Sequence, residues 1–177
     1  MQSSTLTYGS QLLQQQEVTG SPVKLSTQPV QSELPVSLFH SGQLLAIHPK
    51  SRGGLILQRS FYADLIGPGS AVGGYFDVTC KSVYLLGDLK FYVPETYEER
   101  RQSVQKRISC IKKQQSIVLV PTAIERAEMI IDLLCRWLGR AEAQNIPHEL
   151  MSQLAGVLPK TTSLAWQRYL ATSGLRA

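Results

Sequence analysis

The chain has 177 residues, 43% of them hydrophobic and 18% charged, and its formal net charge at pH 7 is +5. These values are ordinary for a globular protein and leave room for one or two small domains with a core. No run of about eighteen apolar residues occurs, so we expect no membrane-spanning helix. The modest positive charge permits nucleic acid or an acidic partner without demanding either.

Cysteine usage and the first residues bear on the compartment. The three cysteines, Cys80, Cys110 and Cys135, are widely spaced and odd in number. This pattern favours a reducing compartment over a disulfide framework or a zinc site. The first residues lack a basic segment followed by an apolar core, so we expect no secretory signal and a cytoplasmic protein.

Residues 1–35 are rich in Gln, Ser and Thr and poor in large apolar side chains. Such a segment buries too little apolar surface to offset the entropy that ordering costs. We expect a loose N-terminal arm with a short helix at 11–17 and a strand at 23–25. An edge that pairs with a partner is the alternative.

Residues 36–94 alternate short apolar runs with breaks of Gly, Pro and Ser. Many short strands at close spacing predict a β-sandwich or barrel. Two histidines in this segment, His40 and His48, have no cysteine or carboxylate at ligand spacing, so we interpret them as surface or capping residues and expect no metal site. The predicted strands are 36–39, 44–47, 55–57, 62–66, 75–80, 83–86 and 91–93.

Residues 95–120 switch to a helical pattern in which apolar residues recur in steps of four and three. This is the spacing of a coiled-coil seam, and its one polar member, Gln115, is placed as a register-setting residue would be. We favour a homodimer through this seam; an amphipathic helix packed on its own domain is the alternative. The seam residues are Val104, Ile108, Ile111, Gln115 and Val118.

The segment 121–138 predicts a second helix. Pro121 ends or kinks the preceding helix, and Thr122 and Glu125 have the spacing of a capping box. The helix is expected over 123–138, with one apolar side, and Gly139 follows as a residue suited to end it.

The stretch 145–170 predicts two short helices around a tight turn. Leu150, Met151, Leu154 and Ala155 give the first helix a buried face, and Gly156 tolerates the positive φ of a turn. Pro159 is suited to begin the second helix, whose inward face is expected to hold Leu164, Ala165, Trp166 and Tyr169. Such a unit docks in the DNA major groove, or is a helical hairpin with no DNA.

The order H-x-x-[LM]-x-x-L-A-G-V-x-x-x-T-x-S-x-A-x-x-R-x-L resembles the DNA-binding domain of Crp/Fnr-type transcription regulators. The G-P-G-x-x-x-G signature at 67–73 is similar to that of cyclic-nucleotide-binding jelly rolls. The residues that carry the first resemblance are His148, Met151, Leu154, Gly156, Val157, Thr161, Ser163, Ala165, Arg168 and Leu170.

The resemblance implies an α+β fold. A β-sandwich or jelly-roll-like domain at 36–94 is followed by a dimerisation helix at 95–120 and a helix-turn-helix domain at 121–177, after the arm at 1–35.

The chain also departs from the family. A cyclic-nucleotide site needs an arginine for the phosphate and a glutamate for the ribose. No arginine lies between Phe61 and Arg100, and Gly74 or Tyr75 stands at the glutamate position. We therefore expect no cyclic nucleotide and no other cofactor.

The DNA-reading positions differ as well. Pro159, Lys160 and Leu164 stand where these regulators often carry base-reading residues, and the chain ends at Ala177 without room for the β-wing. No P-loop, G-x-S-x-G or G-x-G-x-x-G motif occurs, so we expect no enzyme activity.

Two functions remain open. The first is a dimeric transcription regulator that binds duplex DNA, mainly through phosphates. The second is a degenerate, non-DNA-reading interaction module that binds a regulator or the transcription machinery. The DNA-binding candidates are Lys160, Thr161, Thr162, Ser163, Gln167 and Arg168.

Overall fold

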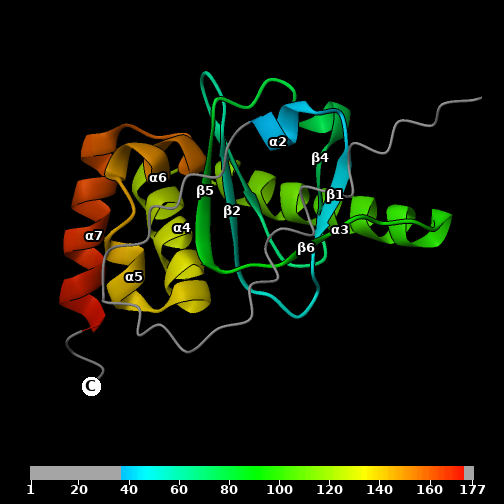
Figure 1. The fold of residues 1–177 in the computed structure, drawn as a ribbon. Helices are drawn as coiled ribbons and strands as arrows, with labels where there is room; N and C mark the ends of the chain where they lie inside the picture. The colour runs from blue at the N-terminus through cyan, green and yellow to red at the C-terminus, as the bar shows by residue number, and fades with distance from the viewer. Residues whose placement is uncertain (1–36, 174–177) are drawn as a thin grey trace, which may run out of the picture.

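The computed structural model describes residues 37–173, so the predictions for the arm at 1–35 lie outside the described residues. The described chain is a mixed α+β structure (Figure 1). Its strands are β1 (Leu44–Ile47), β2 (Arg52–Gln58), β3 (Ala63–Ile66), β4 (Ala71–Gly73), β5 (Ser82–Asp88) and β6 (Phe91–Tyr92). Its helices are α2 (Ser37–His40), the 3-10 helix η1 (Gly74–Phe76), α3 (Tyr97–Val118), α4 (Ala123–Leu138), α5 (Arg140–Gln144), α6 (His148–Ala155) and α7 (Pro159–Ser173).

The strands form two antiparallel three-stranded sheets, in the orders β4-β1-β6 and β3-β2-β5. Successive side chains of a strand point to opposite faces, and β2 uses both. Leu55 and Leu57 are fully buried in a core that they share with Ile47 and Val72 of the other sheet. Ile56 lies in a second core, with the helices. Burial on both faces explains why β2 has a continuous apolar run.

Most of the predicted strands are confirmed. Those at 44–47, 55–57, 62–66, 83–86 and 91–93 correspond to β1, β2, β3, β5 and β6, and β4 was not predicted. The predicted class, α+β, is confirmed at that level, whereas the jelly-roll topology stays a prediction.

Two predicted strands are wrong. Residues 36–39 were expected as a strand, but 37–40 form α2, where Phe39 is fully buried in the core between the sheets. A short apolar run does not distinguish a strand from a buried helical turn. Residues 75–80 do not continue as a strand because Gly73 and Gly74 adopt φ of 73° and 59° and turn the chain into η1.

Helix α3 begins with a capping box at Thr96 and Glu99. The Glu99 carboxylate accepts hydrogen bonds from the backbone N–H groups of Thr96 and Glu95, which lower the pKa of Glu99. The capping box predicted at Thr122 is wrong: Thr122 precedes α4 but its side chain makes no capping hydrogen bond. Arg126 instead donates to the carbonyls of Val120 and Pro121 at this helix start.

Helices α4 to α7 pack on one another, and α4 and α6 also pack on the sheet β3-β2-β5. Figure 1 shows this group at one end of the molecule, with α3 running past the sheets and extending beyond them at its N-terminal end. The indole of Trp137 on α4 lies against the sheet at Gly54, where an added Cβ would be 2.5 Å from its Cζ3. Only glycine permits this approach.

One hydrophobic core therefore joins the β segment to the helices. It includes Ile56, Leu65 and Leu86 from the sheet together with Ile130 and Leu154 from α4 and α6. The predicted boundaries near 95 and 121 mark changes of secondary structure, but the core continues across both. Within residues 37–173 no helix is long and apolar enough to cross a membrane.

The shared core predicts one cooperative unfolding transition. Leu65→Ala in β3 should lower the free energy of unfolding by roughly 2–4 kcal/mol, because Leu65 is 4% exposed and its removal leaves a cavity. Trp137 and Trp166 on the helices should report the same urea midpoint shift as far-UV circular dichroism. Leu170→Ala, at a 39% exposed position, is the control and should change little. Two separate transitions would contradict the shared core.

Candidate functional site

The α6–α7 turn forms as the sequence predicts. Gly156 adopts a left-handed conformation with φ 62° and ψ 45°, and its N–H donates to the carbonyl of Ser152. Val157 N–H donates to the same carbonyl, and Pro159 is the first residue of α7. The turn is fastened to α4 by Arg126, whose guanidinium donates to the carbonyls of Ala155 and Gly156.

The buried side of α7 differs from the prediction at two positions. Ala165 and Trp166 are buried, and the Trp166 indole N–H donates to Met151 Sδ at 3.2 Å. Leu164, predicted to face inward, is 52% exposed. Thr162, predicted to face DNA, is 1% exposed. At about 100° per residue, Thr162 lies on the side of Ala165 and Trp166, and Leu164 does not.

The other DNA-binding candidates are accessible to different degrees. Lys160, Gln167 and Arg168 are exposed, whereas Thr161 and Ser163 are half-buried. Ser163 Oγ lies 2.9 Å from His148 Nδ1 and donates to the carbonyl of Pro159. Arg168 Nε forms an ion pair with Glu128 Oε1 of α4 at 3.2 Å. A DNA phosphate would therefore have to replace a carboxylate at Arg168.

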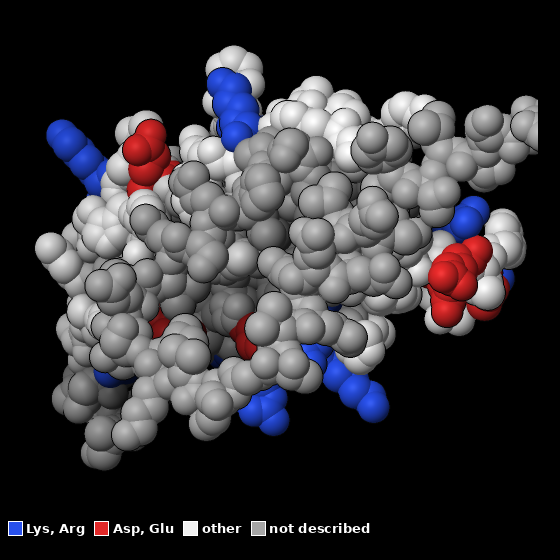
Figure 2. All heavy atoms as spheres, viewed as in Figure 1, with Lys and Arg blue, Asp and Glu red and all other residues white. Residues whose placement is uncertain are grey.

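The surroundings of Arg168 are acidic. Glu125, Glu128 and Asp132 line a groove of about 510 Å³ between α4 and α7, together with Arg168 and Met129. Carboxylates that line the same groove as Arg168 repel a phosphate and so disfavour its binding there. Among the described residues that are visible in Figure 2, Lys and Arg side chains appear as separate spots.

The predicted seam of α3 lies beside the face that packs on the protein's own sheets. Ser103, Arg107 and Ile117 are buried on the packed face. Of the seam, Ile108 and Val118 are 45% and 41% exposed, Gln115 is exposed, and Val104 and Ile111 are half-buried. The seam is thus a mainly apolar strip that residues 37–173 leave partly uncovered.

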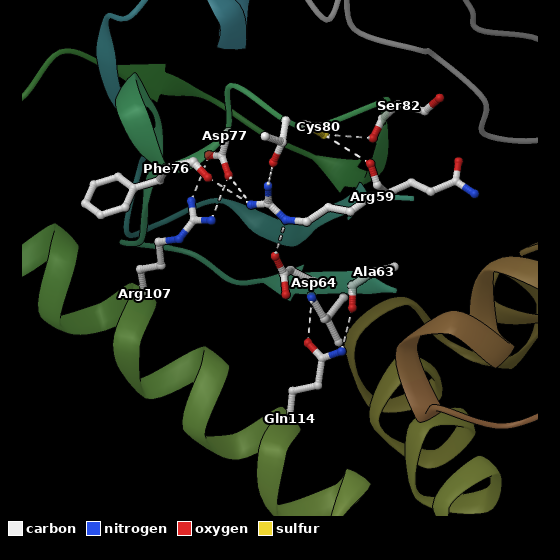
Figure 3. Close-up of polar contacts among 12 residues, drawn as sticks. Arg59, Ala63, Asp64, Phe76, Asp77, Cys80, Ser82, Arg107 and Gln114 are labelled. Carbon is white, nitrogen blue, oxygen red and sulfur yellow. Dashed lines mark hydrogen bonds and ion pairs between the residues drawn. The ribbon is translucent and has the colours of Figure 1, made fainter. Parts of the chain in front are cut away.

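Gln114, next to the seam, connects three elements. Its Nε2 donates to the carbonyls of Ala63 in β3 and Leu154 in α6, and its Oε1 accepts from the backbone N–H of Leu65 (Figure 3). The amide side chain thereby ties α3 to the free edge of β3 and to α6. The sequence marks Gln114 only as a polar residue of the helix.

Asp77 is the centre of a buried ion cluster that the sequence analysis missed. Its carboxylate is fully buried and accepts from Arg107 Nη1 and Nη2 at 2.8 and 2.7 Å (Figure 3). It also accepts from Arg59 Nη2 at 2.9 Å and from the N–H of Gly73 at 2.7 Å. Arg59 in turn pairs with Asp64 at 3.0 Å. Two guanidinium groups and two carboxylates balance the charge.

Arg59 and Arg107 lie on either side of residues 61–99, the stretch in which the sequence has no arginine. Arg59 follows β2 and Arg107 lies on α3, so only the fold brings them to η1. Burial alone would lower the pKa of Arg59, but the hydrogen bond and charge of Asp64 outweigh it and raise that pKa. Burial, together with the charge of Asp77, also raises the pKa of the nearby Cys80 thiol. Cys80 therefore stays protonated at neutral pH and donates to Ser82 O.

A groove of about 550 Å³ lies between this cluster and α3. Tyr62 and Phe76 line it from the sheet side, and Ile111, Gln115 and Val118 line it from the seam of α3. The guanidinium groups of the cluster stack on its aromatic rings. Arg59 Cζ lies 5.8 Å from the centre of the Tyr62 ring, and Arg107 Cζ lies 5.3 Å from that of Phe76.

Neither the α6–α7 hairpin nor the groove beside the Asp77 ion cluster has the donor set of a metal site. Among residues 37–173, no three histidine, cysteine or carboxylate side chains are placed to hold a metal ion together.

Comparison of the chain with models of protein families, with curated proteins and with solved structures finds no match.

The ion cluster predicts a large effect from a small substitution. Asp77→Asn removes one charge and leaves Arg59 and Arg107 without full compensation, so the free energy of unfolding should fall by about 3 kcal/mol or more. Asp132→Asn is the matched control because Asp132 pairs with Arg136 at the surface, where side chains are 46% and 66% exposed. It should cost less than about 1 kcal/mol. Equal urea midpoints for the two variants would contradict the assignment.

Proposed function

We propose that the protein is a dimeric regulator that binds duplex DNA through α7, in the cytoplasm and without a cyclic nucleotide or other cofactor. The observation that carries the proposal is the α6–α7 hairpin, whose left-handed Gly156 and N-terminal Pro159 present α7 with Lys160 and Gln167 outward. The resemblance of this stretch to Crp/Fnr-type regulators supports the same function.

The dimer part of the proposal rests on the seam of α3. Two seams placed against each other would cover Ile108, Ile111 and Val118 and set Gln115 against its own copy. A two-fold arrangement doubles the cations available to DNA and gives two α7 helices.

The expected binding is weak. Lys160 is accessible, but Arg168 must leave Glu128 before it can bind a phosphate. Each neutralised phosphate contributes close to one unit to the slope of log affinity against log salt, so few contacts give a shallow slope. Gln167 is the residue that can pair with an adenine edge.

A second candidate function is an interaction module that binds another regulator or the transcription machinery. Leu158, Leu164 and Leu170 are 72%, 52% and 39% exposed around α7. Apolar side chains on a helix beside an acidic groove suit a protein partner with a basic, apolar surface better than DNA.

Replacing the two cations of α7 separates these functions. The double variant Lys160→Ala/Arg168→Ala should weaken binding to all duplexes alike and reduce the salt slope, because both side chains would contact phosphates. Electrophoretic shifts on random duplex DNA at several salt concentrations measure both effects. Gln167→Ala should weaken binding only to a preferred site.

The control for this experiment is Lys50→Ala/Lys90→Ala, which removes the same charge from exposed residues of the β segment. It should leave DNA affinity close to that of the parent. If both double variants bind as the parent does, or if the parent shows no shift at low salt, DNA binding through α7 is excluded and the interaction module takes its place.

The dimer is tested with Ile108→Asp. An aspartate at this position would bring two charges into an apolar contact, so sedimentation should show dimers for the parent and monomers for the variant. Gln144→Asp, at an exposed position of α5, adds the same charge away from α3 and should leave the dimer unchanged. A monomeric parent at micromolar concentration would contradict the proposal.

A further inference from the structure

Two loops expose aromatic side chains at the same end of the sheets. The β2–β3 loop carries Phe61 and Tyr62, which are 91% and 51% exposed, and η1 carries Tyr75 and Phe76, which are 92% and 46% exposed. We call these four residues the aromatic face. Single exposed aromatics are common, but four on two adjoining loops are not expected of a surface in contact with water alone.

The Asp77 ion cluster holds Tyr62 and Phe76, the two less exposed residues of the aromatic face. Arg59 donates to the carbonyl of Phe76 and to Asp77, so it joins the β2–β3 loop to η1. It also lies over the ring of Tyr62, and Arg107 lies over that of Phe76. A surface fixed in this way loses little side-chain entropy when it binds.

The aromatic face continues directly into the seam of α3. Tyr62 and Phe76 form one wall of the groove described above, and Ile111, Gln115 and Val118 form the other. The groove is also lined by Arg59, Asp64, Arg107 and Gln114, so a partner that covers the seam meets polar as well as aromatic side chains there.

The charges beneath the aromatic face and its exposed area indicate which kind of partner it binds. The arginines beneath the aromatic face are neutralised by Asp64 and Asp77, so neither Arg59 nor Arg107 offers a free cation to nucleic acid. Large aromatic side chains cover about 150–250 Å² each, so the four together expose on the order of 500 Å². The exposed parts of Ile108 and Val118 on the seam add to this area, toward the roughly 800 Å² per partner of a stable complex.

We propose that the aromatic face is part of the interface with a second copy of this chain. In a two-fold dimer through α3, the aromatic face of one protomer reaches the outer flank of the α3 helix of its partner. That flank carries the exposed cations Arg101 and Lys112, which suit contacts with aromatic rings. This inference rests on the dimer of the proposed function and adds the β segment to its interface.

The test compares two double variants of the full chain by sedimentation. Phe61→Ser/Tyr75→Ser should raise the dimer dissociation constant by about tenfold or more, since interface aromatics dominate binding. Leu158→Ser/Leu164→Ser removes two exposed apolar side chains from the α7 region and should leave the dimer unchanged. Circular dichroism and urea midpoints equal to those of the parent show that the variants fold.

A photo-cross-linking residue in place of Tyr75 identifies what lies against the aromatic face. The expected product is a cross-linked dimer in which the modified residue is joined to a peptide from 97–118 of a second copy. An adduct within the same chain, including one to residues 1–36, would overturn the inference.

The outcomes separate this inference from the dimer itself. A parent that dimerises, loses its dimer on Ile108→Asp and keeps it on Phe61→Ser/Tyr75→Ser would overturn only the role of the aromatic face. A parent that stays monomeric would overturn both, while the DNA-binding result would stand independently.

Discussion

The charge balance around Asp77 is the constraint on which the arrangement of the β segment and α3 depends. A fully buried carboxylate is tolerated only when its oxygens are neutralised and hydrogen-bonded, and Asp77 receives Arg59, Arg107 and the N–H of Gly73. These partners come from β2, α3 and the end of β4. Satisfying one carboxylate therefore fixes the position of α3 across the sheets and the position of the loops that carry the aromatic face.

Contacts of α3 also position the α6–α7 hairpin. Gln114 hydrogen-bonds to α6, and an added Cβ at Gly156 would lie 3.5 Å from Val118 Cγ1 at the end of the seam. Arg126 holds the turn to α4. The α3 seam, which we propose as a dimerisation surface, and the candidate DNA-binding helix thus share neighbours, so the two surfaces have a defined mutual orientation within the chain.

Local signals in the sequence predicted α3, α4, α6 and α7 well, missed α2 and α5, and predicted the buried polar contacts poorly. Gly139, Gly156 and Pro159 fixed the ends of α4, α6 and α7, because glycine and proline restrict the backbone locally. Whether Thr162 is buried depends on which side of α7 packs against α4 and α6. Leu164 was predicted to face inward and is exposed for the same reason. The Asp77 cluster joins residues far apart in the chain, and no pattern in one sequence signals such a convergence.

We propose that two copies of the chain bind one duplex through their α7 helices. Sedimentation of the protein with a fluorescently labelled duplex, at low salt and with protein in excess, measures the mass of the DNA-bound species. The expected species is a complex of two chains per duplex that dissociates as salt rises. Labelled DNA that sediments alone at low salt, or with a single chain bound, would contradict it.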